Sequence, residues 1–277
     1  MRRTDFSFLR HPGTVILLII LLVGIFLPLF INLDPFSTGI SGATAPGSGN
    51  LLGTTRLGQD CFARLVIGFR TSLLVAFTAA VLATIIGTLV GLSGGFAGGL
   101  VDSVSTIITN LLIVVPQLII LILLANILEE TSLLMISVFI GCSSWPWMAR
   151  ALRAQAVSLR LREHVALARL NNQSFIALLV KQILPYISSY AVMAFVMQLG
   201  SALFSEAALS MLGLGPGASE VVTLGRILNE ANQNGAFAYG RWWEYLPPTI
   251  LITLFISSLY SVNTSLETRF NPRMRSR

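Results

Sequence analysis

The chain has 277 residues, of which 54% are hydrophobic and 11% are charged, and it carries a formal net charge of +6. Soluble domains carry about 25% charged residues, so this composition argues against a soluble enzyme and against a nucleic-acid-binding domain. The single lysine, Lys181, follows a valine rather than the glycine of a Gly-Lys-Ser/Thr loop, so the chain is not itself a P-loop ATPase. Two histidines and two cysteines, far apart in the chain, form no pattern typical of a metal site or a disulfide framework.

Several apolar segments are long enough to cross a bilayer, which requires about 20 residues in a helix. Each lacks Asp, Glu, Lys and Arg, and they are residues 14–33, 71–101, 103–128, 131–149, 182–205 and 245–266. The first segment resembles a signal peptide in its position, but its apolar run exceeds the usual length of about 7–15 residues and no small-residue cleavage site follows directly. The sequence therefore predicts an all-α integral membrane protein with about six transmembrane helices.

A glycine-rich stretch at residues 94–99 ends the second apolar segment. Because glycine destabilises helices and favours turns, we expect a helix over residues 72–92, followed by a turn. The third helix is then expected to begin near Asp102, where a carboxylate suits the dipole at a helix N-terminus.

The positive charges assign the two sides of the membrane. Most of the arginines lie in the N-terminal segment, in the loop at 150–181 or in the C-terminal segment, which fall on one side of a six-helix topology. The positive-inside rule places both termini in the cytoplasm. With no internal repeat or polar linker, we predict one membrane protein organised as a cytoplasmic N-terminus (1–13), a first transmembrane helix (14–33), an extracytoplasmic loop (34–70) and a transmembrane domain (71–277).

The cytoplasmic loop at 150–181 is the most charged stretch of the chain. Alanine, leucine and arginine favour a helix up to Leu170, and Ser174 is a suitable N-cap for a second short helix from Phe175. We therefore expect two short helices at an angle beneath the membrane. Composition alone is compatible with arginines that only contact lipid headgroups, whereas the elbow shape favours docking of a cytoplasmic partner.

Sequence motifs recur along most of the chain. Residues 162–169 read Arg-Glu-His-Val-Ala-Leu-Ala-Arg, and residues 182–185 read Gln-Ile-Leu-Pro. Residues 52–73 contain Leu-Gly-Thr-Thr-Arg-Leu-Gly-Gln-Asp and Gly-Phe-Arg-Thr-Ser-Leu. Residues 206–215 read Glu-Ala-Ala-Leu-Ser-Met-Leu-Gly-Leu-Gly, and Asn-Pro-Arg stands at 271–273.

In this order and spacing, the motifs resemble the C-type permease subunits of the dipeptide/oligopeptide/nickel family of ATP-binding-cassette importers. The family's loop motif is Arg-Glu-Tyr-Val-Glu-Ala-Ala-Arg-x-x-Gly, followed by His-Ile-Leu-Pro. This chain departs from it at Ala166, Leu167, Asn172 and Gln182. Asparagine tolerates the left-handed backbone that glycine provides, so Asn172 can keep the turn.

The resemblance implies a type I importer transmembrane domain, multi-pass in a bacterial inner membrane. Its implied partners are a homologous second permease, two cytoplasmic ATPases and an extracytoplasmic substrate-binding protein. The chain itself would bind no cofactor or metal and would catalyse no reaction, because ATP and Mg²⁺ belong to the partner ATPases. Peptides are the implied substrate, with nickel, metallophores and opines as alternatives. The residues implied to couple to the ATPases are Arg162, Glu163, Val165, Ala166, Ala168, Arg169, Asn172, Ser174 and Pro185.

Polar residues inside the apolar segments are candidates for a translocation path. Glu206 is an acid in an apolar stretch, which by default marks a functional site. It also lies about 21 residues beyond Pro185, roughly one membrane thickness, which favours a structural anchor at the outer end of its helix. Asn110, Gln117 and Asn126 can line a wet path or hydrogen-bond neighbouring helices.

Two pairs of residues are candidates on the outside. Asp60 and Arg64 have the spacing of a helix-surface ion pair, which would brace the outside loop or contact a binding protein. Trp242 and Trp243 are typical of an interfacial aromatic belt, with docking of a binding protein as the alternative.

Two other classes of membrane protein remain as alternatives at this stage. A stand-alone secondary transporter would need several buried ionisable residues or inverted repeats with broken helices, and only Glu206 approaches this. An integral-membrane enzyme would need clustered histidines, cysteines or paired carboxylates, which the sequence lacks.

Overall fold

The computed structural model describes residues 11–39, 42–47, 49–127, 132–216 and 221–270. Within these ranges the structure is helical, and the β pairing consists of an isolated bridge between Thr54 and Asp60. The helices are α1 (Pro12–Phe30), α2 (Cys61–Ala97), α3 (Gly99–Val114), α4 (Gln117–Ile127), α5 (Leu133–Arg160), α6 (Glu163–Leu170), α7 (Phe175–Leu178), a π-helical turn (Leu179–Ile183), α8 (Leu184–Met211), α9 (Leu224–Gln233) and α10 (Trp242–Phe270). The first ten residues of the predicted N-terminal segment and the Asn-Pro-Arg motif at 271–273 lie outside the described residues.

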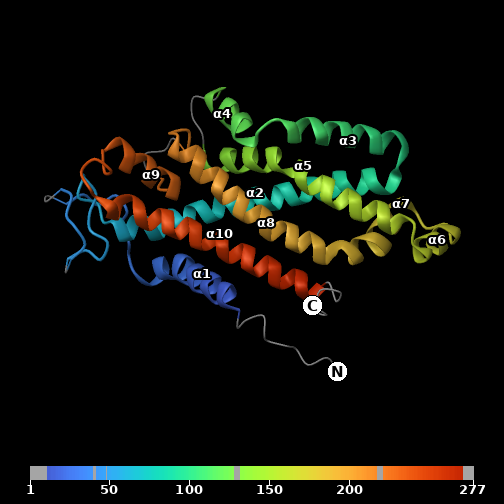
Figure 1. Cartoon of the computed structure of the whole chain (residues 1–277), viewed down its shortest axis with the longest axis horizontal. Helices are drawn as coiled ribbons and strands as arrows, with labels where there is room; N and C mark the ends of the chain where they lie inside the picture. Colours follow the sequence, from blue (N-terminus) through green and yellow to red (C-terminus); the bar gives the residue numbers. More distant parts are fainter. Residues whose placement is uncertain (1–10, 40–41, 48, 128–131, 217–220, 271–277) are drawn as a thin grey trace.

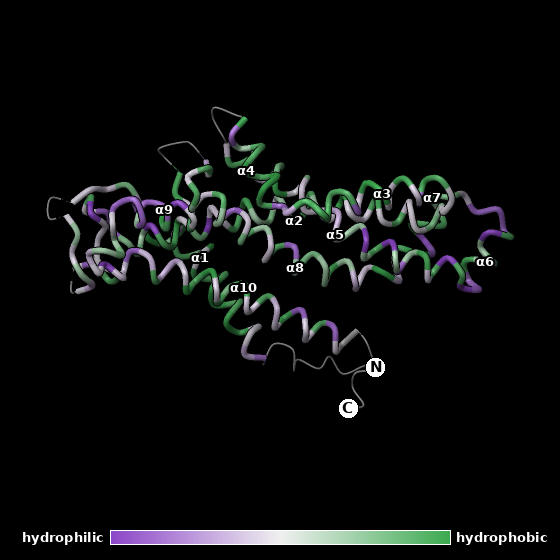
Figure 2. The backbone as a smooth tube through the Cα atoms, turned by 45° about the horizontal axis from the view of Figure 1, so that its top comes forward, coloured by the Kyte–Doolittle hydropathy of each residue, from purple (hydrophilic) through white to green (hydrophobic). Residues whose placement is uncertain are grey.

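The long helices lie side by side, and their connections gather at two opposite ends (Figure 1). One end, called the outer end below, carries α9 and the segment between α1 and α2. The other, called the inner end, carries α6. The first residues of α1 and the last residues of α10 point toward the end that carries α6. Figure 2 shows hydrophilic residues concentrated around α6 and α9, with mostly apolar helices between them. The hydrophilic residues around α6 and those around α9 are therefore separated by the apolar part of the molecule.

Four helices in the described part of the chain are long and apolar enough to cross a membrane: α1, α2, the continuous helix Phe175–Met211 and α10. A fifth span is present if α3 and α4, which meet at 83°, count as one broken span. α5 contains no charged residue up to Ala149 and carries its arginines between Arg150 and its end at Arg160. The total of six spans and the cytoplasmic location of both termini stay predictions.

The prediction of an unbroken third helix at 103–128 is wrong. The helix stops at Val114 and restarts at Gln117, on either side of Pro116. Proline lacks a backbone N–H and disfavours the α conformation of the residue before it, and Val115 is accordingly extended, with φ −82° and ψ 122°.

The predicted glycine turn at 94–99 is also wrong in extent, because α2 continues through Gly94 and Gly95 to Ala97. The turn is confined to Gly98 and Gly99, whose φ angles are +72° and +58°. Gly95 is tolerated because it packs against α5, where a Cβ atom would lie 2.7 Å from the carbonyl oxygen of Arg153. Close approach of the two helices thus compensates for the low helix propensity of glycine.

The predicted extracytoplasmic loop at 34–70 includes the first ten residues of α2, which begins at Cys61. Asp60 caps this helix, with its side chain accepting a hydrogen bond from the backbone N–H of Phe62 at 2.9 Å. The preceding segment folds back on itself, since Thr54 Oγ1 donates to the Gly42 carbonyl at 2.7 Å. The end of the loop therefore holds the start of α2 in place.

Two apolar clusters form the core of the described structure. The outer cluster surrounds Phe69, Leu203 and Phe255, and the rings of Phe69 and Phe255 meet edge to face at 5.4 Å. The inner cluster joins α2, α5 and α8 to the elbow, and consists of Leu92, Phe96, Met148, Leu152, Ala156, Val165, Ala168, Leu178, Ile183, Ile187 and Ala194. The elbow is therefore part of the packed core rather than a free loop.

Candidate functional site

The predicted pair of short helices is wrong in its bounds: residues 150–160 continue α5, α6 is a separate helix that begins at Glu163, and α7 is the start of the continuous helix Phe175–Met211. The elbow consists of α6 and α7. Asn172 adopts a left-handed conformation with φ +53°, as its place in the turn predicts. The side chain of Ser174 caps α7 by accepting a hydrogen bond from the N–H of Ala177 at 3.3 Å, which confirms the predicted N-cap. These two residues set the angle between α6 and the long helix that follows.

The predicted coupling residues divide into an anchored face and a free face of the elbow. Val165 and Ala168 are buried in the inner cluster. Six others are exposed on the elbow, and they are Arg162, Glu163, Ala166, Arg169, Asn172 and Ser174. Pro185 is exposed too, but it lies at the start of α8. The elbow therefore presents a polar surface while two small apolar side chains fix it to the bundle.

Apolar side chains beside these polar residues complete the free face, and none of them was predicted as a coupling residue. They are Leu161, Leu167, Leu170 and Ile176, each more than 60% exposed. A cluster of large apolar side chains on an exposed surface is typical of a protein interface. A sequence signal exists, because Leu167 and Leu170 are one helical turn apart on the side of α6 opposite to its buried residues.

Aromatic contacts connect the elbow to two helices, α2 and α8. The guanidinium of Arg169 lies 4.9 Å from the centre of the Phe96 ring in α2, and Phe96 contacts Phe175 in α7 at 5.4 Å. The imidazole of His164 stacks on the ring of Tyr186 in α8 at 4.7 Å. These contacts attach α6 directly to α2 and α8.

Arginines near the inner end of α5 bind α3. Arg153 forms an ion pair with Asp102, including a 2.8 Å bond from Nη2 to Oδ2. Arg150 donates to the side-chain carbonyl of Asn110 at 2.6 Å. These residues border a cavity of about 290 Å³ between α2, α3 and α5. Asp102 lies in the first turn of α3, as predicted, but its ion pair with Arg153 could not be read from local sequence.

Glu206 is fully buried at the outer end of the bundle. Its carboxylate accepts hydrogen bonds from Ser72 Oγ in α2 at 2.6 Å and from Ser210 Oγ in α8 at 2.7 Å. Ser72 Oγ in turn accepts the backbone N–H of Leu224, the first residue of α9, at 3.0 Å. Glu206 therefore joins α2, α8 and α9, and its position supports an anchoring role more than a place on a translocation path.

We expect Glu206→Gln to retain transport, within about twofold, because an amide can replace both serine bonds. Glu206→Ala should destabilise the protein by about 1–3 kcal/mol for each serine hydroxyl left unpaired. Thermal unfolding in detergent and uptake by intact cells measure the two effects. Normal stability of Glu206→Ala, or loss of transport in a stable Glu206→Gln protein, would contradict the anchoring role.

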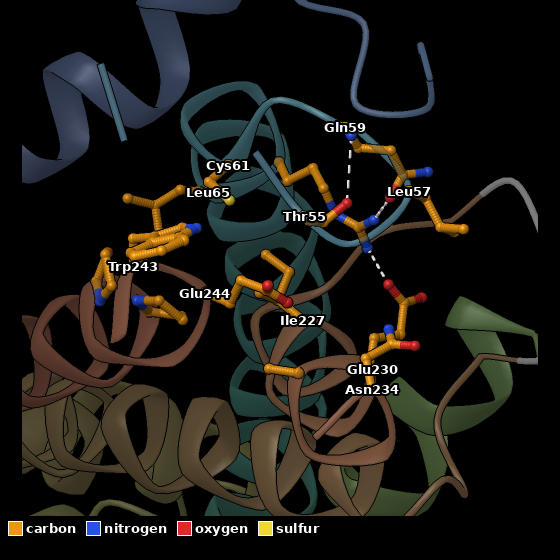
Figure 3. A pocket seen from close by; sticks show the side chains of 14 residues that line it. Thr55, Leu57, Gln59, Cys61, Leu65, Ile227, Glu230, Asn234, Trp243 and Glu244 are labelled. Carbon is orange, nitrogen blue, oxygen red and sulfur yellow. Dashed lines mark hydrogen bonds and ion pairs between the residues drawn. The ribbon is translucent and has the colours of Figure 1, made fainter. Parts of the chain in front are cut away.

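The predicted helix-surface pair of Asp60 and Arg64 is wrong. Asp60 caps α2, whereas the buried Arg64 donates to the side chain of Gln59 and forms an ion pair with Glu230 in α9 (Figure 3). Glu230 also accepts from Arg226 Nε at 2.8 Å. Arg64 therefore braces the outside segments, but through a partner 166 residues away in the sequence.

The two tryptophans of the outer end have different environments. Trp243 is half-buried, and its indole N–H donates to the carbonyl oxygen of Thr54 at 3.1 Å. It lines a small cavity of about 20 Å³ together with Arg64 and Glu244 (Figure 3). Trp242 is 47% exposed and is the one available to a membrane interface or an external partner.

We expect Arg64→Met to destabilise the protein by about 2–4 kcal/mol, because Gln59 and Glu230 lose the buried cation that they contact. The effect is limited because Glu230 keeps some contact with water. Hydrogen exchange of α9 should accelerate in the variant. Arg70→Met, which replaces an exposed arginine farther along α2, is the matched control and should leave this exchange unchanged. Equal exchange of α9 in both variants would contradict the bracing role of Arg64.

A third cavity, of about 390 Å³, lies at mid-length of the bundle between α4, α5, α8 and α10. Gln117, one of the predicted path residues, lines it and donates to Ser143 Oγ at 3.2 Å. Gln198, Ser201 and Tyr260 also line it, and the sequence analysis missed all three. Asn126, the remaining candidate of the third segment, donates to the carbonyl of Ile122 in its own helix at 2.8 Å.

The candidate path residues thus lie in different places. Gln117 borders the mid-bundle cavity, Asn110 borders the inner cavity beside Arg150, and Glu206 is buried at the outer end. In the part of the chain that the structure describes, no three histidine, cysteine or acidic side chains are grouped to hold a metal ion.

Comparison with known proteins gives consistent matches over most of the chain. Residues 87–276 match the family model described as "binding-protein-dependent transport system inner membrane component". The oligopeptide transport system permease protein OppC of Bacillus subtilis is 32% identical over 269 residues, which cover 96% of this chain and 86% of the relative. A putative peptide permease protein of Brucella suis is 31% identical, with 99% and 91% covered. The dipeptide transport system permease protein DppC of B. subtilis is 28% identical, with 99% and 85% covered.

Proposed function

Because this chain belongs to the family of binding-protein-dependent transport system inner membrane components, we propose that it is the permease subunit through which an ATP-binding-cassette importer moves peptides. The three relatives described above carry names of oligopeptide, dipeptide and peptide permeases. Their similarity covers nearly the whole chain, so it includes both ends of the bundle. These names favour peptides over nickel, metallophores or opines as the substrate.

The energy for transport comes, in this proposal, from separate ATPase subunits. The single lysine of the chain is not in a nucleotide-binding loop, so ATP and Mg²⁺ would bind to two partner ATPases. A homologous second permease would complete the membrane domain, and an extracytoplasmic binding protein would deliver the substrate. This chain then contributes a path and a coupling element, and no catalytic group.

The observation that carries the proposal is the elbow, whose free face combines exposed leucines with charged residues at the tip of the molecule. Its anchored face is packed in the inner cluster through Val165 and Ala168. A partner bound to the free face can therefore move the helices that pack against the anchored face. Closure of the ATPases upon ATP binding would shift α6, and α2 and α8 would follow into an outward-open packing, as expected for alternating access.

Purification of the tagged chain from its native membranes in mild detergent tests this assignment. We expect a second permease and ATPase subunits to co-purify. Leu167→Asp combined with Leu170→Asp should reduce the ATPases by about tenfold or more, because docking would then bury two unpaired carboxylates, and should retain the second permease. Leu212→Asp changes an exposed leucine at the opposite end and should retain both partners. A chain that purifies alone and takes up peptide on a proton gradient would identify a secondary transporter instead.

A further inference from the structure

The cavity at mid-length of the bundle has a lining that is polar and uncharged. Its volume is about 390 Å³, and its lining includes Gln117, Ser144, Trp147, Gln198, Ser201 and Tyr260. Among the described residues that line it, none is Asp, Glu, Lys or Arg. Charged side chains border the inner cavity instead, where Arg150 and Arg153 lie. The uncharged polar lining therefore distinguishes this cavity from the inner cavity.

We propose that this cavity binds the main-chain amide groups of a peptide in transit, and that it does so without distinguishing the charge of the peptide's side chains. The proposal rests on the proposed function and adds to it the chemical group that is recognised and the residues that recognise it.

The depth and polarity of the cavity opening argue against lipid as its neighbour. Ser201 lies ten residues before the end of α8 at Met211, which corresponds to about 15 Å along the helix axis. Ser201, Trp147 and Tyr260 are all exposed on the surface of this chain. Acyl chains cannot hydrogen-bond such groups, so polar groups at this depth face a partner or a wet cavity.

Gln198 provides the most specific indication of a ligand. Its side chain is 6% exposed, and its Nε2 atom has no hydrogen-bond partner among the described residues. A primary amide has two donors and an acceptor, and a buried donor without a partner is unfavourable. Because Gln198 lines the cavity, a carbonyl group that enters the cavity can satisfy this donor.

The cavity offers acceptors as well as donors. Ser144 Oγ donates to the carbonyl of Ile140 at 2.7 Å, so its lone pairs are left to accept a hydrogen bond from a ligand. Each peptide unit has one N–H donor and one carbonyl acceptor, and such a lining can pair with both. Since none of the described lining residues carries a formal charge, they offer acidic, basic and neutral side chains no differential electrostatic energy.

Uptake by the complete importer in proteoliposomes tests this recognition. The probes are radiolabelled Ala-Ala-Ala, Ala-Glu-Ala and Ala-Lys-Ala. Gln198→Leu should lower uptake of all three by about tenfold and by the same factor, because one buried hydrogen bond is lost in each case. Asn126→Leu, which removes an exposed amide bonded within its own helix, is the matched control.

Two outcomes of that experiment would overturn the inference. Wild-type uptake by Gln198→Leu would mean that the amide is not used, and loss for only one charge class would mean that side chains are read. Failure of the unaltered importer to take up any of the probes would instead contradict the proposed function. A second measurement then tests whether water and peptide reach the cavity.

That second measurement is cysteine labelling in native membranes. In a Cys142→Ser background, where Cys61 is buried, Ser201→Cys should react with a charged, water-soluble thiosulfonate about tenfold faster than Leu254→Cys, because the thiolate forms only where water has access. Leu254 is exposed on the apolar surface of α10. Added Ala-Ala-Ala should slow the reaction. An unreactive Ser201→Cys would indicate that lipid fills the cavity and would overturn the proposal.

Discussion

Replacing Ala168 with glutamate is expected to reduce ATP-driven uptake by about two orders of magnitude, because burial of an uncompensated carboxylate costs about 3–5 kcal/mol. Ala168 is 5% exposed and belongs to the inner cluster that holds the elbow. The glutamate side chain can reach water only if α6 leaves the bundle. The chain should remain in the membrane, because the apolar helices that insert it are unchanged.

Ala166→Glu is the comparison that separates anchoring from a general effect of charge on α6. Ala166 lies two residues away on the same helix but is exposed, so a glutamate there stays hydrated. Hydrogen exchange of the α6 amides should accelerate in Ala168→Glu and not in Ala166→Glu. Unaltered exchange and normal uptake in Ala168→Glu would contradict the account of how the elbow is attached.

Replacing Gly91 with alanine is expected to lower the stability of the protein by about 1–3 kcal/mol, the usual effect of an extra methyl group in a packed core. A Cβ atom at Gly91 would lie 2.5 Å from the carbonyl oxygen of Ala149 in α5. A backbone atom cannot rotate away, so α2 and α5 must separate. The unfolding midpoint in detergent should fall by about 2–12 °C.

Gly200→Ala is the matched control, since it adds the same methyl group in another long helix. Its Cβ atom would lie 3.4 Å from Leu259 Cδ1, which is ordinary contact with a side chain that can adjust. We expect its unfolding midpoint to equal or exceed that of the unaltered protein, because alanine favours helix over glycine. Equal loss of stability in both variants would show that the α2–α5 contact has no special role.

Local signals predicted the turn and the helix cap of the elbow. Asn172 and Ser174 are residues with strong conformational preferences, and both preferences are fulfilled within a few residues of chain. The polar ends and apolar segments were also evident, because composition alone separates them. Such features depend on neighbours in the sequence and require no knowledge of the fold.

Features that depend on distant partners were not predictable. The cost of Gly94 and Gly95 in a helix is visible in the sequence, whereas their contacts with α3 and α5 are not. Arg64 could be paired only with a nearby acid, although its partner Glu230 lies on α9. The break at Pro116 had a local signal, but the long apolar run around it concealed the division of the helix.

The candidate path was predicted in part. Gln117 borders the mid-bundle cavity, but its neighbours Gln198 and Tyr260 come from helices whose sequences contain several scattered polar residues. Only the packing of α4, α5, α8 and α10 brings these groups to one level. Glu206, the most conspicuous acid in the sequence, is instead used to join three helices at the outer end.

Uptake of radiolabelled Ala-Ala-Ala into proteoliposomes tests most directly whether this chain is an ATP-coupled permease subunit. We expect accumulation only when the chain is reconstituted with the second permease and the ATPases. ATP must be on the side of the elbow and the binding protein on the opposite side. Omission of the ATPases, or Leu167→Asp combined with Leu170→Asp, should abolish it. Accumulation by this chain alone, without ATP and on an imposed proton gradient, would contradict the account.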